Sequence, residues 1–295
     1  MTEENLEIPT ETVENTSEKT FTIKDLLEAG VHFGHRTMRW NPKMAPYIYG
    51  SRNGIHIIDL TQTVLLLNDA MRILREVAKK KGKILFVCTK KQGADIVAKM
   101  AENCGQYHVT NKWLGGMLTN WKTISQSIRK IKSIENQLVS DDKLVKKEKL
   151  YLQKQKEKLE ENFNGIKSIG GRPDLVFVID VPKENLAIAE AKSLHIPVMA
   201  ITDTNADPDK VDYVIPGNDD SIKAIQLYCD IIESSLEEFK QNPEEVKVKR
   251  QPQSQKKSKF VGKGKNFDKK QARKTEKTEK IKEEKTVEKV SEENK

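Results

Sequence analysis

The chain has 295 residues, enough for one large domain or two small ones, and its 36% hydrophobic and 33% charged residues indicate that part of it does not fold. No apolar segment approaches the roughly 20 residues that a membrane-spanning helix needs, which excludes a protein of that class. The three cysteines are scattered without CxxC spacing, which excludes a zinc ribbon and a disulfide framework and predicts a cytoplasmic protein.

The charge is concentrated at the two ends of the chain. Residues 1–20 contain six Glu against Lys19 alone, a net charge of −5, which predicts a disordered acidic arm and no secretory signal. From Lys247 to Lys295 there are eighteen Lys and Arg against eight Asp and Glu, a net charge of +10, so we expect a disordered Lys-rich tail over residues 241–295. Subtracting both ends from the whole-chain charge of +8 leaves +3 for residues 21–246. Nucleic-acid binding by the folded part must therefore depend on local clusters.

The first predicted element is a short helix, with Thr22 and Asp25 at its start and Gly30 at its end. The segment that follows, GVHFGHRTMRWNPKMAPYIYG, is predicted to be a loop. It sets two histidines beside basic and aromatic side chains, so it is a candidate for a metal site, a catalytic site or a phosphate-binding surface. Its candidate phosphate contacts are Arg36, Arg39, Trp40, Asn41, Lys43 and Arg52.

Apolar and amphipathic segments then alternate along the chain. Those predicted to be strands are GIHIIDL, KILFVCT, DLVFVID, PVMAITD and VDYVIP. Those predicted to be helices are TVLLLNDAMRILREVAKKKG, ADIVAKMAENCG, ENLAIAEAKSLHI and SIKAIQLYCDIIESSLEEF. This alternation predicts an α/β domain over residues 21–119 and 166–240, with a parallel sheet covered by helices on both faces.

Residues 120–165 interrupt the alternation with two helical lengths rich in Lys, Glu and Gln. Their apolar residues recur at heptad-like intervals on either side of an SDD turn, at Ile124, Ile128, Ile131, Leu138, Val145, Leu152, Leu159 and Phe163. The narrow seam predicts an inserted antiparallel coiled-coil hairpin that projects from the sheet domain. A polar lid folded back on the sheet is the alternative.

The segment before this hairpin, NKWLGGMLTNWK, mixes basic, aromatic and glycine residues. Gly115 and Gly116 allow either a tight turn or a close approach of the backbone to a phosphate. For Trp113 and Trp121, packing in the core competes with contact to a ligand. The candidate phosphate contacts here and at the base of the hairpin are Lys112, Trp113, Asn120, Lys122, Arg129 and Lys130.

The carboxyl ends of the parallel strands are where a doubly wound sheet binds ligands. The first of these loops, CTKKQGAD, offers Lys90, Lys91 and a single Gly93. It lacks the GxGxxG of a dinucleotide site, and the chain contains no Walker motif, GxSxG elbow or HExxH. Lys90 and Lys91 are candidate phosphate contacts, with a solvated loop as the alternative.

Acidic residues follow the later strands, at Asp180, Asp203, Asp219 and Asp220. Asp219 and Asp220 precede a helix and are candidates to cap it. If the opening loop folds over the strand ends, His32 and His35 could join Asp203 and one of Asp219 or Asp220 in a structural site for zinc or another divalent ion. Local hydrogen bonding and packing of the histidines is the alternative.

Three segments, AGVHFGHRTMRWNPKMAPYIYG, NKWLGGMLTNWKTISQSIRK and TDTNADPDKVDYVIPGNDDSIKAIQLY, in this order, closely resemble the bacterial ribosomal protein S2 family over roughly Phe21 to Phe239. The resemblance implies a flavodoxin-like or Rossmann-like sheet with a coiled-coil hairpin, and a non-catalytic role on the small ribosomal subunit. It also implies contact with 16S ribosomal RNA and neighbouring proteins, and help in anchoring the mRNA-binding protein S1. The acidic arm and the basic tail depart from the family pattern.

The candidate phosphate contacts therefore become candidate RNA contacts. We expect no required cofactor, no small-molecule substrate and no membrane partner. The alternative from another class is a nucleotide- or sugar-phosphate-binding enzyme on the same sheet, which would use Lys90, Lys91 and the strand-end acids. A free RNA-binding regulator is a further alternative.

Overall fold

The computed structural model describes residues 21–140 and 145–239. The predicted acidic arm, the basic tail beyond residue 239 and most of the predicted turn inside the hairpin lie outside these ranges. In the described part, no helix is long and apolar enough to cross a membrane.

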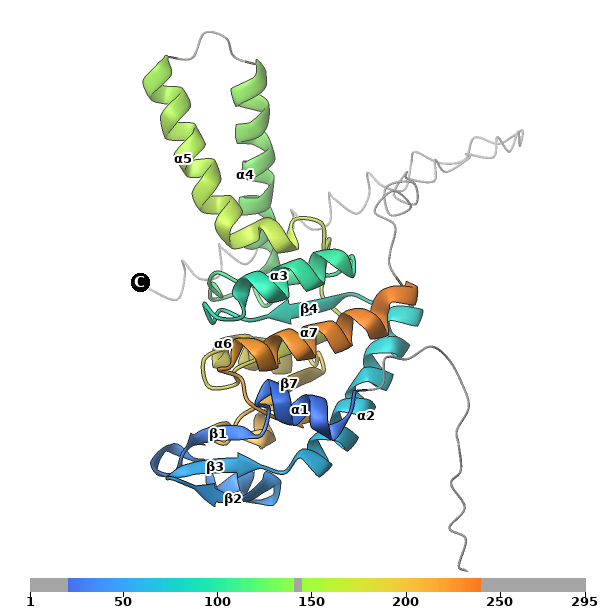
Figure 1. Cartoon of the computed structure of the whole chain (residues 1–295). Coiled ribbons are helices and arrows are strands. Elements are labelled where there is room, and N and C mark those ends of the chain that lie inside the picture. The colour runs from blue at the N-terminus through green and yellow to red at the C-terminus, as the bar shows by residue number, and fades with distance from the viewer. Residues whose placement is uncertain (1–20, 141–144, 240–295) are drawn as a thin grey trace, which may run out of the picture. The chain divides into compact units, whose positions relative to one another are not determined.

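A five-stranded parallel sheet forms the centre of the fold (Figure 1). In the order of the sheet, its strands are β5 (Tyr107–Val109), β4 (Ile84–Val87), β6 (Leu175–Ile179), β7 (Val198–Thr202) and β8 (Tyr213–Pro216). Every residue of β4, β6 and β7 is buried, as expected for strands covered on both faces. The predicted α/β fold with a Rossmann-like parallel sheet is thus confirmed, although the three-residue strand β5 was not predicted.

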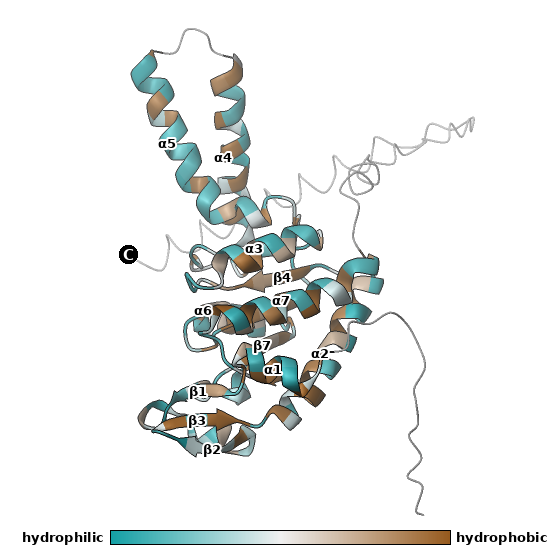
Figure 2. Ribbon diagram, viewed as in Figure 1, coloured by the Kyte–Doolittle hydropathy of each residue, from teal (hydrophilic) through white to brown (hydrophobic). Residues whose placement is uncertain are grey.

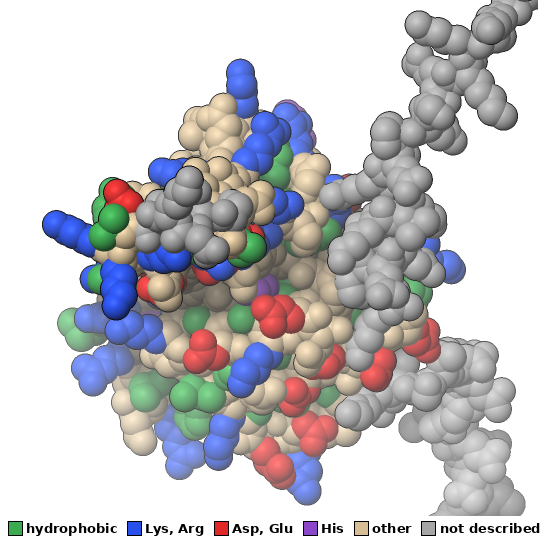
Figure 3. All heavy atoms as spheres, turned by 90° about the horizontal axis from the view of Figure 1, so that it is seen from above, with side chains coloured by type: hydrophobic (Ala, Val, Ile, Leu, Met, Phe, Trp, Pro, Cys, Tyr) green, Lys and Arg blue, Asp and Glu red, His purple; other side chains and the backbone are tan. Residues whose placement is uncertain are grey.

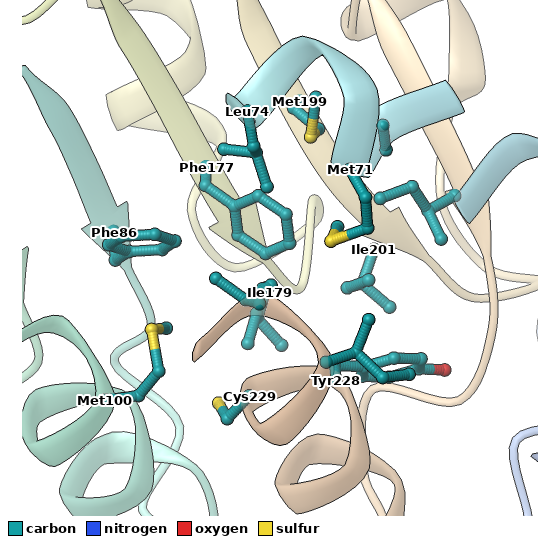
Figure 4. Packing of buried hydrophobic residues seen from close by; sticks show 14 of the residues in the cluster. Met71, Leu74, Phe86, Met100, Phe177, Ile179, Met199, Ile201, Tyr228 and Cys229 are labelled. Atoms are coloured by element: carbon teal, nitrogen blue, oxygen red, sulfur yellow. The ribbon is translucent and has the colours of Figure 1, made fainter. Parts of the chain in front are cut away.

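Helices cover both faces of this sheet. One face carries α1 (Ile23–Ala29), α2 (Leu60–Lys79), α3 (Ala94–Asn103) and α7 (Ile222–Leu236). Their apolar side chains pack with Phe86 and Phe177, whose ring centroids are 5.5 Å apart, and with Met199 (Figure 4). The other face carries α6 (Asn185–Ser193) and the first turns of the hairpin, packed against Leu85, Val176 and Val198. The side chains of successive residues in a strand thus pack on opposite faces of the sheet, as the pleated backbone requires.

The segment predicted to be a loop contains two strands, so that prediction was wrong. Strands β1 (Phe33–Arg36), β2 (Ile48–Arg52) and β3 (Ile55–Ile58) form a separate antiparallel sheet in the order β1-β3-β2. GIHIIDL is therefore a strand, as predicted, but not of the parallel sheet. Asn53 and Gly54 have positive φ angles of 54° and 76° and connect β2 to β3. An Asn-Gly pair between apolar strands is a hairpin signal.

Short 3-10 helices complete the described secondary structure. They are η1 (Thr37–Arg39), η2 (Pro42–Tyr47), η3 (Asn164–Ile166), η4 (Pro208–Lys210) and η5 (Glu237–Phe239).

The inserted hairpin consists of α4 (Trp121–Ser140) and α5 (Lys146–Phe163), which run side by side in opposite directions (Figure 1). Apolar residues occur along both helices (Figure 2), and at the base of the hairpin Ile124, Ile128 and Phe163 join the core of the α6 face. Farther out, Lys156 pairs with Glu135 at 3.3 Å. Val145, predicted to lie in the seam, is 64% exposed. The apolar seam is thus buried at the base of the hairpin. A coiled coil over the full length of the hairpin stays a prediction.

The base of the hairpin therefore belongs to the core, whereas its outer part does not. Replacing residues 137–154 with a short Gly-Ser linker should leave a cooperative melt with a Tm close to that of the full chain, because none of the described residues in this range is fully buried. Replacing residues 120–165 should lower the Tm far more, because it removes Ile124, Ile128 and Phe163 from the core. Thermal melts followed by circular dichroism compare the two. Equal destabilisation by both deletions would contradict this division.

Candidate functional site

The strand-end residues His35, Asp203, Asp219 and Asp220, here called the His-Asp cluster, lie together at the carboxyl edge of the parallel sheet. Nδ1 of His35 is 2.9 Å from Asp203 Oδ2, and its Nε2 is 3.3 Å from Asp220 Oδ2. One potential ligand atom from each of the four side chains lies within 4.8 Å of all the others. The antiparallel sheet thus places β1 over the strand ends, as the sequence hypothesis required.

Backbone contacts fix β1 in this position. His35 N donates to Thr204 Oγ1 at 2.9 Å, and Asn41 N donates to the carbonyl of Thr204 at 2.8 Å. A Cβ on Gly34 would lie 2.6 Å from Thr204 Cγ2, so only glycine fits without displacement. On the other side of the cluster, Asn218 N donates to the carbonyl of Val31 at 3.0 Å.

His32 does not belong to the cluster, which corrects the predicted ligand set. Its ring lies 4.0 Å from that of Phe33, and its Nδ1 is buried without a hydrogen-bond partner among the described residues. Burial lowers the pKa of His32, because it disfavours the charged form of the ring. Residues three apart in an extended segment point to opposite sides, so His32 faces away when His35 faces Asp203.

Lys90 lies among the strand-end acids and is paired with three carboxylates, which argues against its predicted role as an RNA contact. Its Nζ lies 2.7 Å from Asp219 Oδ1, 2.8 Å from Asp220 Oδ1 and 3.0 Å from Asp180 Oδ2. Burial alone would lower the pKa of Lys90, but the carboxylates, Asp219 foremost, outweigh burial and raise it. The side chain is therefore a buried, charged ammonium. Lys91, next in the chain, is exposed.

The His-Asp cluster, taken together with Lys90 and Asp180, contains more carboxylates than cations. Asp180, Asp203, Asp219 and Asp220 face Lys90 and His35, whose pKa is raised chiefly by its hydrogen bond to Asp203. Burial, with Asp203 as the next cause, raises the pKa of Asp219 to about 7. Asp219 Oδ2 is buried and accepts no hydrogen bond from the described residues. An unpaired buried carboxylate oxygen is costly, so the cluster favours an added proton or cation.

The predicted capping role of Asp219 and Asp220 was also wrong. Ser221 is the N-cap of α7, and its side chain accepts a hydrogen bond from Ala224 N. Asn218 Oδ1 accepts from the backbone of Asp220 and Ser221. Both carboxylates are thus left for Lys90 and His35.

The order of the strands places the topological switch point between β4 and β6, where a doubly wound sheet would hold a nucleotide. The side chains at this edge bond to one another. Thr89 donates to the buried carboxylate of Glu184 through both its backbone N and its Oγ1, and Lys183 Nζ donates to the carbonyl of Thr89 at 2.8 Å. With Lys90 paired to Asp180, this arrangement argues against the nucleotide-binding enzyme.

The WLGGMLTNW segment is organised by Glu190 of α6, a residue that the sequence analysis missed. Its carboxylate accepts hydrogen bonds from Trp113 Nε1 at 3.1 Å and from the backbone N of Gly116, Leu118 and Thr119 at 2.8, 2.9 and 3.1 Å, and from Thr119 Oγ1. The backbone N–H groups of Gly116, Leu118 and Thr119 are therefore taken up by the protein's own carboxylate. The available signal was a Glu on the apolar stripe of α6, beside Ala187 and Ala191.

Trp113 is 7% exposed and packs in the core of the α6 face, as the core-packing alternative expected, which argues against its predicted role as an RNA contact. Trp121 is partly buried against the same core.

The remaining predicted RNA contacts lie in two exposed groups. The first is at the free end of the antiparallel sheet, where Arg36, Arg39 and Arg52 are exposed and Trp40 lies against His56, with ring centroids 5.1 Å apart. Two exposed apolar side chains were missed here, Met38 at 94% and Tyr49 at 82%. The second group surrounds the base of the hairpin and consists of Lys112, Asn120, Lys122, Arg129 and Lys130. Figure 3, seen from the hairpin end, shows many exposed Lys and Arg side chains.

Two residues of the opening segment have local partners instead. Asn41 Oδ1 accepts a hydrogen bond from Lys43 N at the start of η2. Lys43 Nζ lies 2.7 Å from Asp209 Oδ2 and 3.1 Å from Asp207 Oδ1. The charge of Lys43 is thus largely neutralised by these carboxylates.

Comparison with known proteins gives consistent matches along the described chain. The family model described as ribosomal protein S2 matches residues 26–239. A protein of Mesorhizobium japonicum named small ribosomal subunit protein uS2 is 58% identical over 213 residues, 72% of this chain and 82% of the relative. The proteins of the same name from Dinoroseobacter shibae and Paramagnetospirillum magneticum are 57% and 56% identical, over 72% and 74% of this chain and 82% of each relative.

The Glu190 contacts make a pH-dependent contribution to stability. Burial would raise the pKa of Glu190, but the surrounding hydrogen-bond donors outweigh burial and hold the pKa below its ordinary value of 4.5. The carboxylate therefore contributes fully above about pH 4.5, and its contribution is lost as the pH falls through the folded-state pKa. Glu190→Gln should lower the free energy of unfolding at pH 7 by about 1–3 kcal/mol for each donor left without an acceptor. Near pH 3 the difference from wild type should shrink.

Urea unfolding at both pH values measures this effect, with Glu157→Gln on the exposed side of α5 as the matched control. Equal stability of the Glu190 variant and wild type at pH 7 would contradict the proposed anchoring.

Proposed function

This chain belongs to the ribosomal protein S2 family, and from that premise we propose that it is a structural constituent of the small ribosomal subunit that binds 16S ribosomal RNA. It contacts neighbouring subunit proteins and helps to anchor the mRNA-binding protein S1, in the cytoplasm. The observation that carries the proposal is the 58% identity to a small-subunit protein over 213 residues. The role of the family is structural and not enzymatic. This agrees with the side chains at the carboxyl edge of the sheet, which bond to one another.

The RNA surface consists of the two exposed groups of basic residues. Folded RNA is bound through phosphates by Lys and Arg and through exposed bases and sugars by planar side chains. At the free end of the antiparallel sheet, Arg36, Arg39 and Arg52 supply the charges and Trp40 the planar side chain. Lys112, Asn120, Lys122, Arg129 and Lys130 supply the second contact at the base of the hairpin, and Lys91 is exposed at a strand end.

We propose in addition that the His-Asp cluster binds a divalent cation such as Zn²⁺. Imidazole nitrogen and carboxylate oxygen are suitable zinc ligands, and the unpaired Oδ2 of buried Asp219 is the specific observation that favours an ion over a closed network. The half-exposed side chain of Asp220 leaves the cluster open to solvent on one side. The ion would tie β1 to the ends of β7 and β8. Its role is structural.

The role on the ribosome is tested by sedimentation. The purified chain should travel with small subunits in a gradient at moderate salt. Changing Arg36, Arg39 and Arg52 together to Ala should weaken this association without lowering the Tm, because the three side chains are exposed. The slope of log affinity against log salt should fall by up to about 3, from the rule of about 0.9 per phosphate for duplexes.

Lys43→Ala is the matched control, because Asp207 and Asp209 already neutralise this charge. It should leave the slope nearly unchanged. If the triple variant keeps the wild-type slope, the RNA surface is misplaced. If the wild-type chain stays at the top of the gradient, the ribosomal role is wrong and a free regulator is favoured.

The metal proposal is tested by elemental analysis of the purified protein and by melting with and without a chelator. A chelator should lower the Tm at pH 7.5 and have a smaller effect at pH 5.5, because only the neutral imidazole binds metal. Asp203 raises the pKa of His35, so protonation competes with the ion from a higher pH than for a free histidine. His35→Ala should abolish the chelator effect and His32→Ala should preserve it. Substoichiometric metal with no chelator effect at pH 7.5 would refute the proposal.

A further inference from the structure

A stripe of four side chains on α5, here called the α5 stripe, is absent from the RNA surface described so far. It consists of Lys147, Tyr151, Lys154 and Lys158, at successive spacings of four, three and four residues. Such spacings place side chains on one face of a helix, and at 1.5 Å per residue the stripe extends over about 16 Å.

The stripe faces solvent. All four residues are exposed, and Tyr151 retains 64% of its accessible surface. The opposite face of α5 holds Leu152 and Leu159, which are partly buried, and Phe163, which lies in the core. No acidic side chain of the described residues forms an ion pair with the three lysines, whereas Lys156, on the inner side, pairs with Glu135 at 3.3 Å. Glu161 continues the same face one turn later, so the basic surface ends at Lys158.

The hairpin that carries the stripe has a net positive charge. Residues 120–165 contain eleven Lys and Arg against seven Asp and Glu, a net charge of +4, whereas residues 21–246 as a whole carry +3. On either side of it, residues 21–119 carry +8 and residues 166–239 carry −8. The hairpin is therefore one of the basic parts of the chain to which a polyanion is attracted.

The side-chain types select RNA among polyanions. A flat aromatic ring exposed between lysines is the arrangement by which proteins stack an unpaired base while holding the adjoining phosphates. An acidic protein surface would use the lysines but would leave the exposed ring without a specific partner.

We propose that the α5 stripe is a third RNA-contact surface, on which Lys147, Lys154 and Lys158 hold phosphates and Tyr151 stacks on an unpaired nucleotide of the ribosomal RNA. This inference rests on the proposed function. It extends the RNA surface from the base of α4 to the outer face of α5.

The first test uses the full chain and small subunits that lack this protein. Changing Lys147, Lys154 and Lys158 together to Gln should reduce the salt slope by about 2, at about 0.7 per phosphate for single strands. The matched control changes three exposed lysines on other helices, Lys79, Lys99 and Lys223, to Gln, which removes the same charge. Equal reductions by the two variants, or no reduction by the first, would overturn the proposal.

The second test concerns the ring. Tyr151→Ala should weaken binding by roughly 5- to 150-fold, and Tyr151→Phe should retain binding, because stacking needs the ring and not the hydroxyl. A photoreactive aromatic residue at position 151 should cross-link to 16S ribosomal RNA in assembled subunits. Cross-linking to a protein alone would overturn the proposal while leaving the ribosomal role intact. Failure of the wild-type chain to bind subunits would overturn both.

Discussion

The structure depends on the neutralisation of buried negative charge where the parallel strands end. Asp203 and Asp219 are almost completely buried, and a buried carboxylate is tolerated only when a cation or several hydrogen-bond donors face it. Lys90, which follows β4, pairs with Asp219, and His35 of the antiparallel sheet pairs with Asp203. The contact between His35 and Asp203 therefore also joins the two sheets, which share no hydrogen-bonded strands. The carboxyl edge of the sheet, where related folds bind a ligand, is thus occupied by ion pairs that stabilise the fold.

Glu190 satisfies the same requirement in a different way. Its carboxylate has no lysine or arginine partner among the described residues and is surrounded by backbone and side-chain donors of one turn. That turn leads directly into α4, so a buried charge on α6 determines where the hairpin leaves the sheet. Breaking such an arrangement on one side only is costly, because the remaining groups stay buried and unpaired. In both places buried carboxylates orient an exposed element that carries candidate RNA contacts.

The accuracy of sequence-based reasoning differed between local and long-range features. The strands LVFVI and VMAIT were predictable because continuous apolar runs of this length are typical of strands covered on both faces. The grouping of Asp203 with Asp219 and Asp220 was also predictable, because parallel strands end at one edge. The approach of His35 was only a hypothesis, because it depends on the position of β1, a strand of the other sheet. Strands β1 and β2 were not predicted, because they are short and a proline-containing 3-10 helix lies between them. The pairing of Lys43 with Asp207, 164 residues away, leaves no local pattern. The hydrogen bond from Trp113 to Glu190 likewise leaves no local sequence pattern.

The insertion of the hairpin between neighbouring strands has a consequence for folding kinetics. Ile84 of β4 pairs with Leu175 of β6, 91 positions later in the chain, so this pairing closes a long loop. Helices form in about a microsecond, well before such distant segments meet. Once residues 120–165 have folded back on themselves, the loop that remains to be closed is about half as long, which lowers the entropic cost of closure by about 0.6 kcal/mol. The insertion thus acts as a fast-folding local unit that shortens the loop between β4 and β6.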